Sequence, residues 1–117
     1  IISSFNEPLW TGAAYPLSSH TITPSKKITD CMTGWILRWQ AYNRDAGTVI
    51  DSDFHYVHIP KIHVMHNNGA GVRFVLERDG VGIVSKYVYV YDDRIVGHAS
   101  NQLGANYHIV LSGVFEY

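Results

Sequence analysis

The sequence is poor in cysteine and in charge, and it contains no long apolar run. Its single cysteine, Cys31, excludes a disulfide within the chain. Charged residues make up 16% of the sequence, below the usual value of about 25%. The net charge of −1, with no basic cluster larger than Lys26-Lys27, predicts no nucleic-acid partner. No stretch approaches the roughly 18 apolar residues of a membrane span, so we also expect no membrane partner.

The length of 117 residues fits one domain. The sequence begins at Ile1 instead of Met, from which we expect a fragment or processed product with upstream sequence missing. We assign residues 1–8 to the end of an upstream linker or neck, and residues 9–117 to a single domain.

Alternation of apolar and polar residues with a period of two dominates this domain, and it predicts strands. Trp35, Leu37 and Trp39 alternate with more polar residues, and three tyrosines alternate with valines between residues 83 and 91. The expected strands, about eight, are 8–15, 20–23, 34–42, 54–59, 73–77, 83–91, 94–97 and 108–117. Only residues 25–33 suggest a helical turn, which Gly34 would end. Asp79-Gly80 and Asp92-Asp93 look like short turns. Without crossover helices, the pattern favours an all-β fold, an antiparallel β-sandwich or jelly roll.

A second apolar surface is expected outside the core of this sandwich. In the last strand, Ile109, Leu111 and Phe115 alternate with valines that would occupy the opposite face. A strand that is apolar on both faces is either central or covered again by a partner chain. We therefore predict a homo-oligomer. The interface residues predicted are Tyr87, Tyr89, Tyr91, Val110 and Val114. For the three tyrosines, packing in the core and a ligand platform are the second and third alternatives.

The seven histidines and the acidic residues do not form a recognisable metal site or catalytic motif. His55/His58 and His63/His66 are three residues apart, and such pairs diverge on a strand. One cysteine does not supply the paired ligands of zinc. Most acidic residues fall at expected turns, and the chain has neither a Gly-x-Ser-x-Gly elbow nor a phosphate loop. We expect no catalytic residues, no metal and no cofactor. A hydrolase that uses a pair of aspartates is the least favoured alternative.

Aromatic residues are the more informative group. Three tryptophans accompany eight tyrosines and four phenylalanines, and flat rings beside a few polar groups are typical of saccharide sites. Trp35 and Trp39 are expected in the core, so the predicted site relies on polar loop residues instead. The predicted saccharide-binding residues are Arg44, Asp45, Asn67, Asn68, Asp92, Asp93 and His98. Arg44 is the candidate for a phosphate group, because a guanidinium offers two parallel donors.

Several short motifs, taken together in their order and spacing, resemble one protein family. They are Leu9-Trp10-Thr11-Gly12, His20-Thr21-Ile22-Thr23-Pro24, Gly34-Trp35-Ile36-Leu37-Arg38-Trp39, Ile59-Pro60-Lys61, Ser85-Lys86-Tyr87-Val88-Tyr89-Val90 and Gly97-His98-Ala99-Ser100-Asn101. From Leu9 onward, the chain resembles the C-terminal head domain of siphophage tail receptor-binding proteins, found in streptococcal, lactococcal and Listeria phages. The family carries an acidic residue soon after the second tryptophan, where this chain has Gln40-Ala41-Tyr42-Asn43-Arg44-Asp45.

This resemblance implies a β-sandwich head that forms a homotrimer at the tip of a phage tail. It implies binding of cell-wall polysaccharide or phosphopolysaccharide of a Gram-positive host. Other tail or baseplate proteins would be contacted through the upstream region. The alternative is a trimerisation or assembly cap of a tail fibre that binds no ligand.

Overall fold

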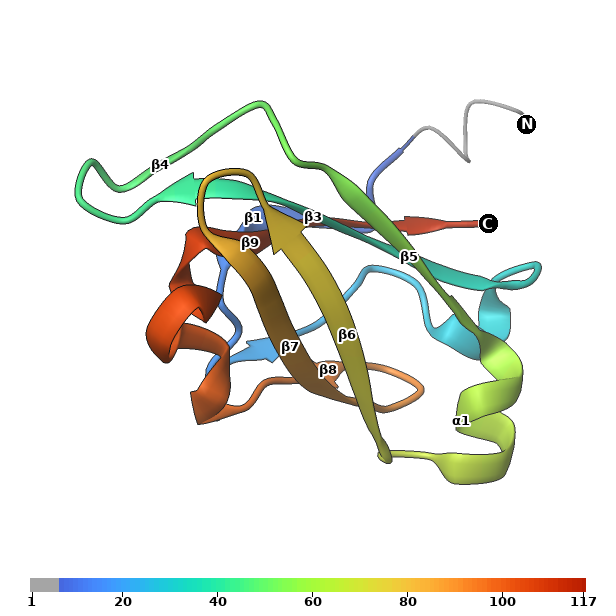
Figure 1. Cartoon of the computed structure of the whole chain (residues 1–117). Coiled ribbons are helices and arrows are strands. Elements are labelled where there is room, and N and C mark those ends of the chain that lie inside the picture. Colours follow the sequence, from blue (N-terminus) through green and yellow to red (C-terminus); the bar gives the residue numbers. More distant parts are fainter. Residues whose placement is uncertain (1–6) are drawn as a thin grey trace.

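The computed structural model describes residues 7–117 and shows two antiparallel β-sheets packed face to face (Figure 1). In the first sheet, β1 (Trp10–Ala14), β9 (Ile109–Glu116), β3 (Gly34–Asn43) and β4 (Thr48–Val49) follow in this order, and β5 (His55–Pro60) also pairs with β3. The second sheet has the order β2 (Thr21–Ile22), β8 (Ile95–Val96), β7 (Gly82–Val90) and β6 (Gly71–Arg78). The predicted all-β sandwich is confirmed. Residues 7–117 contain nine strands, and the one not expected is the short β4.

Alternation along β3 and β7 places their apolar residues between the two sheets, as expected. Trp35, Leu37 and Trp39 of β3 are fully buried, and so are Val88 and Val90 of β7. The sheets meet where the ring of Trp39 lies 5.8 Å from that of Phe74 on β6. The indole Nε1 of Trp35 donates to the carbonyl oxygen of Lys26 at 3.1 Å, so this buried donor is satisfied.

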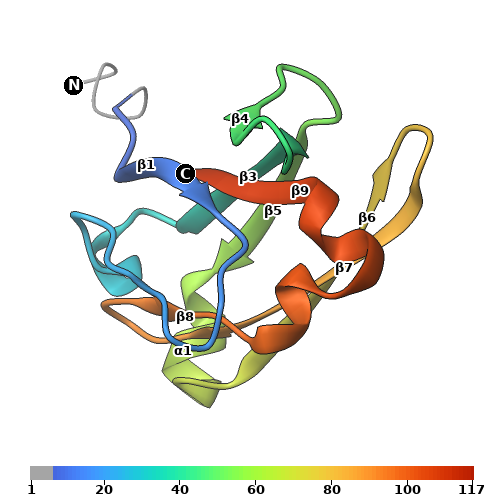
Figure 2. The same ribbon diagram turned by 90° about the vertical axis from the view of Figure 1, so that its left-hand side faces the viewer.

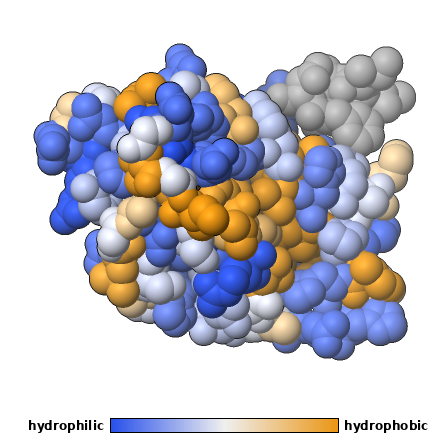
Figure 3. Space-filling view, in the orientation of Figure 1, coloured by the Kyte–Doolittle hydropathy of each residue, from blue (hydrophilic) through white to orange (hydrophobic). Residues whose placement is uncertain are grey.

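The sandwich is open along one side, between the edge strands β5 and β6. Figure 3 shows apolar surface in the middle of this face, between the positions of the two strands in Figure 1. Val57 of β5 and Val72 of β6 are partly buried residues that pack against the core. At one end of the opening, Nε2 of His55 accepts a hydrogen bond from the main-chain N–H of Glu77 at 3.2 Å. The imidazole thus joins the two sheets.

The predicted faces of the last strand are wrong beyond its middle. The register of β9 against β3 shifts between the pairs Trp39–Leu111 and Arg38–Gly113, which marks a β-bulge. One extra residue reverses the alternation, so Val114 points into the core of the chain's own sandwich. Val110 and Val114 are at most 1% exposed. They have no surface left for a partner, and their predicted role in an interface is wrong.

The prediction for the histidines at positions 63 and 66 is also wrong. They lie on α1 (Lys61–Asn67), a helix that begins directly after Pro60 at the end of β5. Residues three apart on a helix share a face, so this pair does not diverge. His55 and His58 do diverge, because both lie on β5. The predicted turn within 25–33 is confirmed as a 3₁₀ turn, η2 (Ile28–Asp30). Within residues 7–117, no helix has the length and apolarity to cross a membrane.

The two ends of the described chain lie on the same side of the molecule, at the right of Figure 1. Trp10 pairs with Val114, and the N–H of Leu9 donates to the carbonyl oxygen of Val114 at 2.7 Å. Of the predicted linker 1–8, residues 1–6 lie outside the described residues.

Candidate binding site

The connection between β8 and β9 folds into two 3₁₀ helices, η3 (Ala99–Gln102) and η4 (Gly104–His108), that lie beside β7 (Figure 2). The Asn101 side chain accepts from the N–H of Tyr87 at 2.8 Å and donates to its carbonyl oxygen at 2.9 Å. Oδ1 of Asn106 accepts from the N–H of Ser85 at 2.8 Å. These two amides satisfy part of the β7 edge, much as a neighbouring strand would. They hold η4 at the end of the sandwich where β3 ends.

The turn after β3 is the second part of the site. Oδ1 of Asn43 accepts from the N–H of Ala46 at 3.1 Å, and Gly47 closes the turn with φ of 68°. Because glycine adopts positive φ without strain, the chain can return tightly into β4. Arg44 and Asp45 are thereby presented next to η4.

A hollow of about 210 Å³, the Arg44 pocket, lies between this turn and η4. Its lining residues are Tyr42, Asn43, Arg44, Asp45, Ile50, Arg78, Tyr107 and His108. It is smaller than the roughly 300–1,000 Å³ of drug-sized ligand sites, so it fits one sugar or phosphate group better than a long oligosaccharide.

Aromatic rings and a guanidinium meet in the Arg44 pocket. The guanidinium carbon of Arg44 lies 4.5 Å from the ring centroid of Tyr107, and the rings of Tyr107 and His108 are stacked at 4.1 Å. Tyr15 lies behind Tyr42, with their rings edge to face at 5.8 Å. Burial raises the pKa of the Tyr15 hydroxyl, and neighbouring Tyr42 raises it further. Among the described residues, Arg44 forms no ion pair, so its charge is available to an anionic group.

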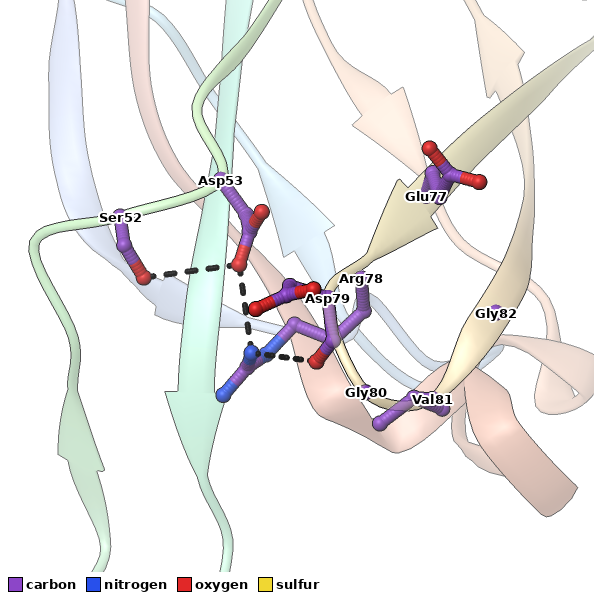
Figure 4. A pocket seen from close by; sticks show the side chains of 8 residues that line it. All are labelled: Ser52, Asp53, Glu77, Arg78, Asp79, Gly80, Val81 and Gly82. Carbon is purple, nitrogen blue, oxygen red and sulfur yellow. Dashed lines mark hydrogen bonds and ion pairs between the residues drawn. The ribbon is translucent and has the colours of Figure 1, made fainter.

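A broader hollow of about 800 Å³ lies beside the β6–β7 hairpin (Figure 4). Arg78 lines both hollows, and its Nη1 forms an ion pair with Oδ2 of Asp53 at 3.2 Å. Figure 4 shows this pair between the hairpin and the segment that carries Ser52. None of the described residues that line the broader hollow is aromatic. We therefore place the candidate site in the Arg44 pocket, with the broader hollow as its extension.

The predicted saccharide residues do not form a single site. Arg44 and Asp45 lie in the pocket, whereas Asn67 and Asn68 lie at the end of α1, on the far side of the molecule from the β3–β4 turn in Figures 1 and 2. Asp92 is close to Asn68, whose Oδ1 accepts from the Asp92 N–H at 3.2 Å.

The remaining predicted polar residues already have partners within the chain. Oδ1 of Asp92 accepts from the N–H of Thr29 at 3.1 Å and from its hydroxyl at 2.6 Å. Asp93 forms an ion pair with Arg94 at 2.8 Å. Nδ1 of His98 accepts from the N–H of Ser100 at 3.1 Å. These contacts fold loops, and they leave Arg44 and Asp45 as the predicted residues that line a hollow.

Of the three predicted interface tyrosines, Tyr87 and Tyr89 lie on the outer face of the second sheet and Tyr91 follows directly after β7; all three are half-buried. The rings of Tyr87 and Tyr89 meet edge to face at 5.3 Å. The guanidinium of Arg73 lies 4.9 Å from the Tyr87 ring centroid, and that of Arg94 lies 3.9 Å from the Tyr91 centroid. The alternative of core packing between the sheets is therefore wrong for these residues.

Sequence reasoning missed most of the pocket. Arg78 comes from β6, and Tyr107 and His108 come from η4, so no local motif links them to Arg44. Tyr42 lies only two residues before Arg44, but it was not among the predicted residues. Within residues 7–117, no three His, Cys, Asp or Glu side chains gather as metal ligands would.

The fold and the pocket define an antiparallel β-sandwich with an aromatic, cationic hollow between loops at one end. Comparison with protein-family models, curated proteins and solved structures finds no match for this chain.

Proposed function

We propose that this domain is a recognition module that binds cell-wall saccharide in the Arg44 pocket and performs no chemical step on it. The observation that carries the proposal is the unpaired guanidinium of Arg44 lying against the Tyr107 ring, beside Asn43 and Asp45. The aromatic lining suits the apolar parts of a sugar, and the polar groups suit hydroxyls. The guanidinium suits a phosphate through paired hydrogen bonds.

We propose further that the domain is the receptor-binding head of a siphophage tail, located at the tail tip of the virion. The motifs from Leu9 to Asn101 support this assignment, together with the sandwich fold. The host would be a Gram-positive bacterium. A small pocket gives a weak single site, which repetition in a trimer would strengthen by about 10²- to 10⁴-fold in avidity.

The Arg44→Ala substitution tests the pocket. Wild type and variant are titrated with purified polyglycerol phosphate and with a neutral wall polysaccharide, and binding is expressed per chain. Loss of a hydrogen bond to a charged group should weaken binding of the phosphate polymer by roughly 10- to 100-fold. Arg38→Ala is the matched control, because Arg38 also lies over an aromatic ring, that of Phe115, but is outside both the pocket and the tyrosine face.

Equal weakening by both substitutions would remove Arg44 from the binding site. Absence of binding to any wall polysaccharide at millimolar concentration would overturn the proposed function. It would then favour the alternative of an assembly cap without a ligand.

A homotrimer that contacts its neighbours through Tyr87, Tyr89 and Tyr91 is part of the same proposal. The rings of Tyr87 and Tyr89 lie on the outer face of the second sheet, on the side away from the core. Tyrosine and arginine are both enriched at protein interfaces, which fits the neighbouring Arg73 and Arg94.

A further inference from the structure

Lys86 is a lysine that the fold encloses completely. It lies on the inward face of β7, where it has no exposed surface. Its Nζ donates to three main-chain carbonyl oxygens: Asn106 at 2.7 Å, Asn101 at 2.8 Å and Tyr15 at 3.1 Å. Three acceptors match the three protons of an ammonium group. Among the described residues, no carboxylate forms an ion pair with it.

The surroundings of Lys86 compensate in part for the burial of a positive charge. Nζ lies 5.4 Å from the ring centroid of Tyr15 and 5.7 Å from that of Trp39, close enough for both ring faces to attract the cation. A buried charge requires such compensation, because removal from water alone would cost several kcal/mol. The titratable side chain that these contacts place against Nζ is that of Tyr15, through its ring.

Two of the three acceptors of Lys86 adjoin the aromatic walls of the Arg44 pocket. Asn106 immediately precedes Tyr107, and the Arg44 guanidinium lies over the Tyr107 ring. Tyr15 contacts the ring of Tyr42 edge to face at 5.8 Å. One ammonium group therefore ties η4 and the segment after β1 to β7, directly behind the pocket.

We propose that Lys86 is a positioning residue of the Arg44 pocket: its ammonium fixes the walls formed by Tyr42 and Tyr107, and loss of one proton loosens them. The effect on ligand affinity rests on the proposed saccharide function. The effect on the pocket walls does not.

The ammonium group of Lys86 loses a proton near neutral pH. Burial lowers the pKa of Lys86 to about 7. Below this pH the ammonium donates to all three carbonyl groups. Above it a neutral amine has two N–H donors, so one carbonyl loses its partner. The walls are then less well held, and affinity should decrease as the pH rises through 7.

The test compares the wild-type chain with Lys86→Met between pH 6 and pH 9. The probe is polyglycerol phosphate, whose phosphodiesters do not change charge in this range. The wild-type dissociation constant should rise by roughly three- to tenfold across the range, as partial loss of one hydrogen bond would give. Lys86→Met should bind weakly throughout and lack this step. Any pH dependence left in the variant belongs to groups other than Lys86.

Lys61→Met is the matched control, because Lys61 also donates to a main-chain carbonyl, that of Cys31 at 3.2 Å. It lies on α1, outside the pocket, and its substitution should leave the pH profile unchanged.

Amide hydrogen exchange separates this inference from the proposed function. Corrected for intrinsic rates, protection of residues 99–108 should fall in wild type above pH 7 and be low in Lys86→Met at every pH. If protection changes in this way but the wild-type chain does not bind the polymer, the positioning role of Lys86 is supported and the proposed saccharide site is contradicted. Should the variant not fold, the wild-type exchange profile and an NMR titration of the Lys86 side chain decide. Protection independent of pH from 6 to 9, or a Lys86→Met profile equal to wild type, would overturn the inference.

Discussion

Glu116 shows how a single residue can make stability depend on pH. Its side chain is 6% exposed, and both of its carboxylate oxygens accept from Nζ of Lys26, at 3.0 and 3.1 Å. The hydrogen bond from Lys26 lowers the pKa of Glu116, and the N–H of Met32 contributes in the same direction. The folded state therefore holds this proton less tightly than the unfolded state does.

A carboxyl whose pKa is lowered on folding stabilises the protein above its unfolded value, near 4.3, and loses that contribution as the pH falls through its folded value. We expect the urea midpoint of wild type to decrease between pH 5 and pH 3, and Glu116→Gln to show a shallower decrease. Glu77→Gln, at an exposed position, should keep the wild-type slope. Equal slopes in the two variants would contradict this role of Glu116.

Single residues were predictable from the sequence where their role is local. Trp35, Leu37 and Trp39 are buried because alternation on a strand determines which face each side chain occupies. Arg44 and Asp45 were found because a polar turn exposes its side chains. Tyr107 and Arg78 were not found, because their contacts with the turn depend on how distant segments pack.

Elements were predictable wherever the backbone keeps a regular period. The β-bulge in β9 interrupts that period by one residue. Gly113, directly after Ser112, is the sequence signal that could have indicated it. Helix α1 was missed for a related reason: its seven residues follow a strand without an N-capping side chain. Pro60 precedes its first residue, and a short helix of this kind is stabilised mainly by packing against its neighbours.

Substitutions at adjacent positions of β9 test the bulge. Val114→Asp should prevent folding, because it would place an unpaired carboxylate in the core. Phe115→Asp should fold, because position 115 is on the outer face, where the Arg38 guanidinium lies 5.1 Å from the Phe115 ring centroid. Circular dichroism and urea unfolding distinguish the two. The opposite result, with Val114→Asp folded and Phe115→Asp unfolded, would contradict the bulge and indicate that apolar residues alternate regularly along the whole of β9.

At the scale of the whole molecule, two outer sheet faces remain available to other chains. The second sheet presents Tyr87 and Tyr89, and the first presents Tyr56, which is 57% exposed. We expect wild type to be trimeric by light scattering, and Tyr89→Glu to weaken association by at least about 30-fold, as loss of a hot-spot residue does. Tyr56→Glu should remain trimeric. If only Tyr56→Glu dissociated the trimer, the interface would lie on the first sheet instead. A monomeric wild type would contradict the proposed trimer.

The pairing of β1 with β9 determines how this molecule responds to mechanical load. Both described ends leave the sandwich beside the Trp10–Val114 pair, while the Arg44 pocket lies at the opposite ends of β3 and β9. Tension between Leu9 and Tyr117 would peel β1 from β9 one hydrogen-bonded pair at a time. Tension between Leu9 and a ligand in the pocket would run along the strands. Since hydrogen bonds between antiparallel strands lie across the strand direction, they would share this load in shear. The domain should thus resist a pull through its pocket far better than a pull through its two ends.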